Sequence, residues 1–312
     1  MRILVVGAGA TGGYFGGRLL EAGRDVTFLV RPRRAEALAA TGLAIRSGRG
    51  DATIENPPTV LAADLESRGP FDLVLLSCKA YDLDGAIASF APAVGPGSIV
   101  LPMLNGMRHL ETLDARFGTE RVLGGACFIS AALDDAGRII HRSDVHGLVY
   151  GARLEEQAAA VQAASTAFQG ANFNPRASDD ILLDMWEKWV FLAALAGTTC
   201  LVRASVGDLA AAGGSDLAVA LLDECNAIAV AVGRPPRQKH LDWARGILTD
   251  RGSTMTASML GDVERGAPTE ADHILGDLIR RAPRPADGSP SLLRTAYLAL
   301  GAYEARRRRE HP

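Results

Sequence analysis

The chain of 312 residues has no cysteine pairs, no long apolar run and no excess of basic charge. Its four cysteines stand singly, which favours reduced thiols in a cytoplasmic protein over a disulfide framework. The longest apolar run, Trp189 to Leu201, is too short to cross a bilayer. A net charge of -3 gives no support for a nucleic-acid or membrane-surface binder.

Several catalytic signatures are also missing. The sequence contains no P-loop, no nucleophile elbow and no His, Cys and carboxylate spacing typical of a metal site. It also lacks the Tyr-x-x-x-Lys pattern of short-chain reductases. What remains is a globular composition, 48% hydrophobic and 22% charged, in a chain long enough for two domains.

The first residues carry a glycine-rich motif in an informative place. An apolar stretch ending at Val6 leads into GAGATG, and a helical stretch from Tyr14 follows. In such a motif the first glycine permits a tight turn, the second lets backbone approach a pyrophosphate, and the third lets helix and strand pack closely. The motif predicts a dinucleotide-binding unit whose candidate cofactor residues are Gly7, Ala8, Gly9, Ala10, Thr11 and Gly12.

Hydrophobic patterning divides the chain in two. Apolar runs at 26–30, 71–77 and 98–103 alternate with helical spacing, which predicts a parallel doubly wound sheet. Strands at 121–132 and 139–150, joined by a turn at 134–137, are expected to extend this sheet. Helices are expected at 179–200, 215–232, 236–249, 253–264, 269–281 and 289–309.

The turn-rich stretch 170–175 marks the expected boundary between these halves. The sequence therefore predicts an α/β doubly wound dinucleotide-binding domain over residues 1–174. An all-α domain that carries substrate and catalytic residues is predicted over 175–312. A homodimer formed through the helical domain is a hypothesis from fold-level analogy alone.

The second strand decides which nicotinamide cofactor is expected. NAD-binding units usually place an acidic residue at its end, whereas here Arg31 and further arginines follow Val30. A guanidinium can fork onto a 2′-phosphate, so NADPH is favoured, with a solvated basic loop as the alternative. Lys79 and Asn105 follow two other strands, where ligands of parallel sheets bind. The alternatives are a solvated lysine and an asparagine that turns the chain.

The helical half offers candidates for carbonyl chemistry. Lys188 is the last charge before an apolar run, so desolvation could lower its pKa and suit it to proton donation. Glu270 could pair with it or with a ligand hydroxyl, and Ser258 could donate to a substrate carboxylate. The alternatives are a snorkelling lysine, a first-turn glutamate favoured by the helix dipole and a surface serine.

Taken together, these motifs resemble the ketopantoate reductase (2-dehydropantoate 2-reductase) family over nearly the whole chain. The matching segments are GAGATGG, Arg31, Ser-Cys-Lys79-Ala, Leu-Asn105-Gly-Met, Gly-x-Ile-x-His141, Trp-x-Lys188, Ser258-Met-Leu-x-Asp262 and Thr269-Glu270. The resemblance implies NADPH-dependent reduction of a 2-oxo acid, most simply ketopantoate to pantoate in pantothenate biosynthesis, in a cleft between the domains.

Residue roles carried over from the resemblance follow the matching positions. Lys188 would be the general acid, with Glu270 as its polar partner near nicotinamide and substrate. Asn105 would bridge cofactor and substrate, and Ser258 would hold substrate oxygens. Arg31 and Lys79 would hold the adenosine phosphate end of NADPH.

The chain departs from the family pattern after the lysine. Characterised members usually carry substrate-binding asparagines four and eight residues on, where this chain has Leu192 and Ala196. A lost buried donor typically costs about 1–3 kcal/mol of binding. A less polar carbonyl substrate and a non-catalytic NADPH-binding protein therefore stay open. So does another dehydrogenase of the same layout, an opine or sugar-phosphate dehydrogenase for example, and His273, one turn beyond Glu270, keeps that hypothesis open.

Overall fold

The computed structural model describes residues 1–282 and 291–310 and divides into two compact units. The first unit holds residues 1–105 and 109–184, and the second holds residues 106–108 and 185–312. The units thus divide after Asp184 rather than at the expected 174/175 boundary. The reason is that β10 (Asn174–Ala177) pairs in parallel with β9 (Ile139–Gly151) inside the first unit.

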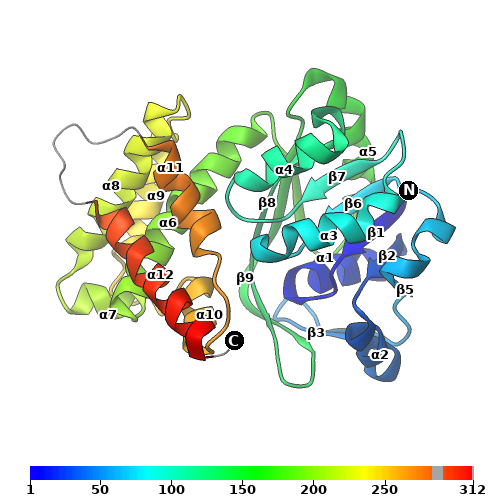
Figure 1. Cartoon of the computed structure of the whole chain (residues 1–312), viewed down its shortest axis with the longest axis horizontal. Coiled ribbons are helices and arrows are strands. Elements are labelled where there is room, and N and C mark those ends of the chain that lie inside the picture. The colour runs from blue at the N-terminus through cyan, green and yellow to red at the C-terminus, as the bar shows by residue number, and fades with distance from the viewer. Residues whose placement is uncertain (283–290, 311–312) are drawn as a thin grey trace. The chain divides into compact units, whose positions relative to one another are not determined.

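A five-stranded parallel sheet forms the centre of the first unit (Figure 1). Its strands in order are β5 (Thr59–Val60), β2 (Asp25–Leu29), β1 (Arg2–Val6), β6 (Leu73–Leu76) and β7 (Ile99–Pro102). Strands β1 and β6 are apolar throughout their centres because both of their faces are buried. The helices of this unit are α1 (Ala10–Glu21), α2 (Pro32–Thr41), α3 (Leu83–Phe90), α4 (Arg108–Phe117) and α5 (Ala158–Phe168).

The strands expected at 121–132 and 139–150 do form, but most of their length builds a second sheet. Val122 forms an isolated parallel bridge to Val100 of β7. The two strands are β8 (Gly124–Leu133) and β9, and they pair antiparallel through the expected turn, in which the Gly137 amide donates to the Asp134 carbonyl at 2.9 Å. With β3 (Leu43–Arg46), β4 (Ala52–Ile54) and β10 they make a second sheet. The prediction of one continuous sheet was wrong.

Glycines on α1 explain how two sheets can pack on one helix. A Cβ on Gly16 would lie 2.6 Å from the Phe28 ring of the parallel sheet. A Cβ on Gly17 would lie 2.8 Å from Ile45 Cδ1 of the second sheet. Only glycine permits such close approach on both sides, so α1 packs closely between the two sheets at Gly16 and Gly17.

The described part of the second unit is all helical, as expected (Figure 1). Its elements are α6 (Ile181–Val202), α7 (Val206–Ala211), α8 (Ser215–Ala231), α9 (Gln238–Leu248), α10 (Ser258–Glu264), the π-helical turn η7 (Asp272–Gly276), α11 (Asp277–Arg281) and α12 (Leu292–Glu310). Within the described ranges no helix is both long and apolar enough to span a membrane. Of the helix expected at 289–309, residues 289 and 290 lie outside the described residues.

Two expected helices differ in detail. The helix expected from residue 253 begins only at Ser258, because the carbonyls of Ser253 and Met255 accept hydrogen bonds from the start of α7 instead. The helix expected over 269–281 is π-helical at η7. There the Trp189 indole donates a hydrogen bond of 2.9 Å to the Ile274 carbonyl, which satisfies a backbone group released by the irregular turn.

Candidate functional site

The parallel sheet gathers the predicted cofactor residues at one edge. Strands β2, β1, β6 and β7 all run in the same direction, so their carboxyl ends share that edge. The glycine turn follows β1, Arg31 follows β2, Lys79 follows β6 and Asn105 follows β7. Strand β1 has β2 on one side and β6 on the other, which is the topological switch point where ligands of such sheets bind.

The structure gives a different explanation for glycine at each of the three motif positions. Gly7 adopts φ +96°, a conformation that side chains rarely allow. A Cβ on Gly12 would lie 2.1 Å from Ser77 Oγ and 2.2 Å from the Gly7 carbonyl oxygen. A Cβ on Gly9 would meet nothing within 4 Å. The backbone conformation therefore requires glycine at position 7 and packing requires it at position 12, whereas the open space at Gly9 leaves room for a ligand close to the backbone.

Two side chains hold this turn from outside the motif. Ser77, directly after β6, donates a 2.8 Å hydrogen bond to the Val6 carbonyl. Arg34 on α2 donates through Nε to the Ala8 carbonyl at 3.0 Å. Burial lowers the pKa of Arg34, and its Nη2 is buried without a hydrogen-bond partner among the described residues. Neither contact could be predicted from the residues near it in the sequence.

Arg31 stands at the start of α2 and forms an ion pair with a residue that lies far from it in the sequence. Its side chain is 81% exposed, and Nη2 lies 3.1 Å from the Asp82 carboxylate. Asp82 ends the short 3-10 turn Ala80–Asp82, which Lys79 precedes. A basic residue and an acidic residue thus meet where the sequence predicted basic residues alone.

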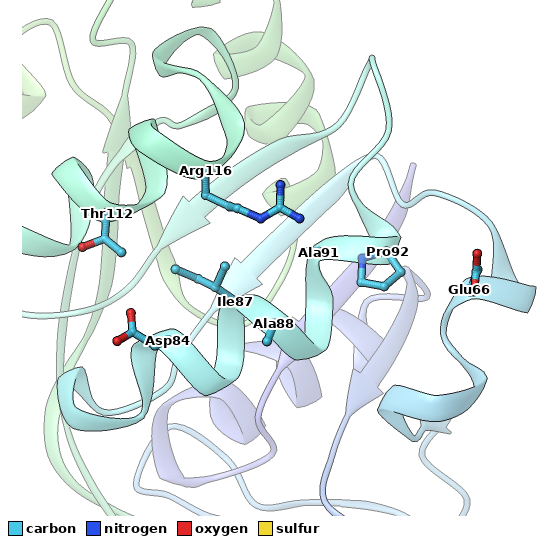
Figure 2. A pocket seen from close by; sticks show the side chains of 8 residues that line it. All are labelled: Glu66, Asp84, Ile87, Ala88, Ala91, Pro92, Thr112 and Arg116. Atoms are coloured by element: carbon cyan, nitrogen blue, oxygen red, sulfur yellow. The ribbon is translucent and has the colours of Figure 1, made fainter.

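A groove of about 700 Å³ lies elsewhere on the first unit (Figure 2). Ile87 and Ala88 of α3 face Thr112 and Arg116 of α4 across it. Its lining extends from Asp84 in α3 to Pro92 just beyond that helix and includes no residue of the glycine turn, nor Arg31, Lys79 or Asn105. The groove is therefore distinct from the glycine turn.

In the second unit, helix α6 carries the predicted general acid. Lys188 is 7% exposed, and Glu187 beside it is 6% exposed. Arg237 donates two hydrogen bonds to the Glu187 carboxylate, from Nε at 2.8 Å and from Nη2 at 2.7 Å. The negative charge next to Lys188 in the sequence is thus compensated by an arginine in bidentate geometry.

The segment containing Glu270 is anchored on α6 and on α12. The Glu270 carbonyl accepts the Ile274 amide at 2.9 Å, and the Ile274 carbonyl in turn accepts the indole of Trp189. The preceding residue, Thr269, donates its amide to Glu304 at 2.6 Å. These bonds fix the backbone on both sides of Glu270, which is half-buried.

The turn after Asn105 packs on the same segment. Gly106 has φ +75°, and a Cβ there would lie 3.1 Å from His273. Arg108 pairs with Asp272 at 2.9 Å, and Arg280 and Tyr297 also donate to that carboxylate. Burial raises the pKa of Asp272, but these hydrogen bonds outweigh it and hold the pKa at about 2.

Ser258 is exposed at the start of α10, and this start is also fixed to α6. The Ala257 amide donates to Thr199 Oγ1 at 3.2 Å. Lys188, Leu192, Ala196 and Thr199 follow helical spacing along one stripe of α6. Beyond Lys188 this stripe is apolar at Leu192 and Ala196, so its middle offers no hydrogen-bond donor.

The fold and the glycine turn define a dinucleotide-binding protein with a helical second unit. The family model described as "Ketopantoate reductase PanE/ApbA" matches residues 3–156, and its C-terminal model matches residues 180–290. The chain belongs to this family of nicotinamide-dependent reductases, and it is an oxidoreductase.

Individual relatives agree with this assignment. An "Uncharacterized oxidoreductase YkpB" of Bacillus subtilis is 41% identical over 98% of this chain and 99% of its own. A crystal structure of 2-dehydropantoate 2-reductase from Geobacter metallireducens is 28% identical, covers 97% and 99% of the two chains and has a TM-score of 0.87. A ternary structure of D-mandelate dehydrogenase with NADH and anilino(oxo)acetate, 18% identical, covers 99% of each chain with a TM-score of 0.88 and shares the fold.

Proposed function

We propose that the protein reduces a 2-oxo acid to a 2-hydroxy acid with NADPH, with ketopantoate as the leading substrate. The observation that carries the proposal is that α6 carries Lys188 and anchors the two segments that hold Glu270 and Ser258. This helix holds buried Lys188, binds the backbone beside Glu270 through Trp189, and binds the backbone beside Ser258 through Thr199.

The cofactor residues present fit a dinucleotide. The free space at Gly9, opposite the tightly packed Gly12, is what a pyrophosphate near the start of α1 requires. We assign the turn Gly7–Gly12 to the pyrophosphate, Arg31 and Lys79 to the adenosine end, and Asn105 to the junction of cofactor and substrate. When bound, NADPH would supply the hydride that reduces the carbonyl carbon.

The second unit would supply the proton and the substrate contacts. Lys188 donates a proton to the carbonyl oxygen as negative charge develops there. Glu270 accepts a hydrogen bond from the lysine or from the substrate and so orients the acid. Ser258 donates its hydroxyl to the substrate carboxylate. The proposal requires that Lys188 reach the oxygen of the same carbonyl whose carbon accepts the hydride.

The apolar stripe of α6 favours a second candidate substrate. Leu192 and Ala196 cannot donate hydrogen bonds to a polar substituent, so a 2-oxo acid with an apolar side chain would lose less binding than ketopantoate. The ternary structure of D-mandelate dehydrogenase holds anilino(oxo)acetate on the same fold. We therefore keep a less polar 2-oxo acid as the alternative within the same reaction. A homodimer and a cytoplasmic location stay predictions.

The test is NADPH consumption by the purified protein with ketopantoate and with alkyl and aryl 2-oxo acids, using NADH as the cofactor control. We expect turnover with NADPH, and we expect Lys188→Ala to lower kcat by about 10²–10⁴-fold while NADPH still binds. Lys239→Ala, an exposed lysine on α9, is the matched control and should keep full activity. Unchanged turnover by Lys188→Ala would reject the general-acid role. Tight NADPH binding without turnover on the panel would favour a non-catalytic protein.

A further inference from the structure

The ion pair between Arg31 and Asp82 joins the loops that follow the two strands on either side of β1. Arg31 follows β2 and Asp82 lies beyond β6, while β1 with its glycine turn stands between these two strands. The pair, at 3.1 Å, therefore joins the two neighbours of β1 at the carboxyl edge of the sheet. The Asp82 carboxylate is thus paired with the Arg31 guanidinium, which is the group expected to bind the 2′-phosphate of NADPH.

Asp82 stands at the N-terminus of α3, where a negative charge is favourable but is not specifically required. It precedes α3 as the N-cap residue, but its side chain makes no capping hydrogen bond. Its carboxylate is turned to Arg31 instead, and both side chains are substantially exposed, at 41% and 81%. Exposed ion pairs of this kind add little to stability, so the stability of the fold does not depend on Asp82 facing Arg31.

The chemistry of the two nicotinamide cofactors differs at this point. A 2′-phosphate carries nearly two negative charges, so it must displace Asp82 from Arg31 and is then repelled by the nearby carboxylate. A ribose 2′-hydroxyl can instead donate to the carboxylate. NAD-binding units use an acidic residue after the second strand for that contact.

We infer that Asp82 is a specificity-determining residue that weakens the preference for NADPH over NADH. The inference rests on the proposed assignment of Arg31 to the 2′-phosphate. Asp82 acts in two ways, by holding Arg31 when no cofactor is bound and by opposing the phosphate when NADPH is bound. The arginine favours the 2′-phosphate of NADPH, and the acidic residue reduces that preference.

The size of the effect follows from Coulomb's law. A single charge and a double charge about 6 Å apart in water repel by an amount worth about tenfold in binding. Screening at an ionic strength of about 0.1 M reduces this tenfold effect, because the Debye length is then about 10 Å. The effect must therefore grow at low salt, unlike a change in packing.

The experiment measures dissociation constants of NADPH and NADH for the wild type, Asp82→Asn and Arg31→Ala, without substrate, by nicotinamide fluorescence. Asp84→Asn is the matched control, because this substitution removes the same charge. Asp84 lies in the first turn of α3 and lines the separate groove (Figure 2). We expect Asp82→Asn to tighten NADPH binding about five- to tenfold at low salt. NADH binding should stay equal or weaken, and Asp84→Asn should change either constant less than twofold.

Two outcomes overturn the inference in distinguishable ways. If Arg31→Ala weakens NADPH but Asp82→Asn shifts the NADPH-to-NADH affinity ratio by less than twofold, Asp82 is only a surface partner and the cofactor assignment survives. If Arg31→Ala leaves NADPH binding unchanged, the 2′-phosphate is not held at this place, and the assignment and the inference are both wrong.

Discussion

Alanine at Gly9 and alanine at Gly12 should separate the ligand-binding role of the motif from its packing role. At Gly12 the new Cβ would lie 2.1 Å from Ser77 Oγ and 2.2 Å from a backbone oxygen. The backbone cannot move aside without disturbing Gly7, so we expect a loss of about 1–3 kcal/mol in the free energy of unfolding, typical of overpacking.

At Gly9 the same methyl group meets nothing within 4 Å, and φ is -81°, which alanine adopts freely. Alanine is a poorer N-cap than glycine by about 1 kcal/mol, and the reduced entropy of the unfolded chain offsets this by about 0.4–1 kcal/mol. Stability should therefore change by less than about 1 kcal/mol. Binding of NADPH should weaken by at least about tenfold, because the methyl group takes the space assigned to the pyrophosphate.

Urea unfolding, followed by circular dichroism, measures the first quantity, and NADPH fluorescence titration of the folded protein measures the second. The expected pattern is a stable Gly9→Ala that binds poorly and a Gly12→Ala of reduced stability. The reasoning is refuted if Gly9→Ala binds NADPH as the wild type does. It is also refuted if both variants lose the same stability.

Two further predictions concern the second unit. Leu192→Asn should raise kcat/KM for ketopantoate about tenfold relative to an apolar 2-oxo acid, measured by competition, because it supplies a donor on the stripe of Lys188; an unchanged ratio would place the substrate elsewhere. Asp272→Asn should reduce stability at neutral pH. Because the folded pKa of Asp272 is depressed to about 2, its contribution is full above a pH of about 4 and disappears as the pH falls towards 2. Urea unfolding at pH 6 and pH 2.5 tests this, and a difference independent of pH would contradict it.

The parallel sheet, and the candidate cofactor residues at the carboxyl ends of its strands, could be predicted because the sequence patterns that indicate them are local. Strands buried on both faces are apolar throughout, and parallel strands must present their carboxyl ends together. Gly7, Arg31, Lys79 and Asn105 could be placed at one edge from these two facts. The roles assigned to them stay predictions until binding is measured.

Strands β8 and β9 could be predicted, but the second sheet that they build could not, because their partner strands give weak signals. Strands β3, β4 and β10 are short, and Asn174–Ala177 is mostly exposed and polar. The residue of α1 that indicates a second sheet is Gly17, where a Cβ would lie 2.8 Å from Ile45 of that sheet. That glycine indicates close packing on the far side of α1, but its partner, Ile45, lies far along the chain.

The connections around the candidate residues were also beyond sequence reasoning. Asp82 meets Arg31, Ile274 meets Trp189 and Ala257 meets Thr199, each across many residues and without a shared motif. The apolar helix after Lys188 allowed either a desolvated or a snorkelling lysine, and the structure buries it at 7% exposure. The compensation of Glu187 by Arg237 could not be predicted, because a tertiary contact alone creates it.

The central claim is hydride transfer from NADPH to the carbonyl carbon of a 2-oxo acid, with a proton delivered by Lys188. The most direct measurement uses NADPH deuterated at C4, a 2-oxo acid from the panel, and mass spectrometry of the product. We predict a 2-hydroxy acid carrying one deuterium at C2 from one face of the nicotinamide, and no such product from Lys188→Ala in the same time. Oxidation of NADPH without deuterium in a 2-hydroxy acid, or equal product from the variant, would contradict the account.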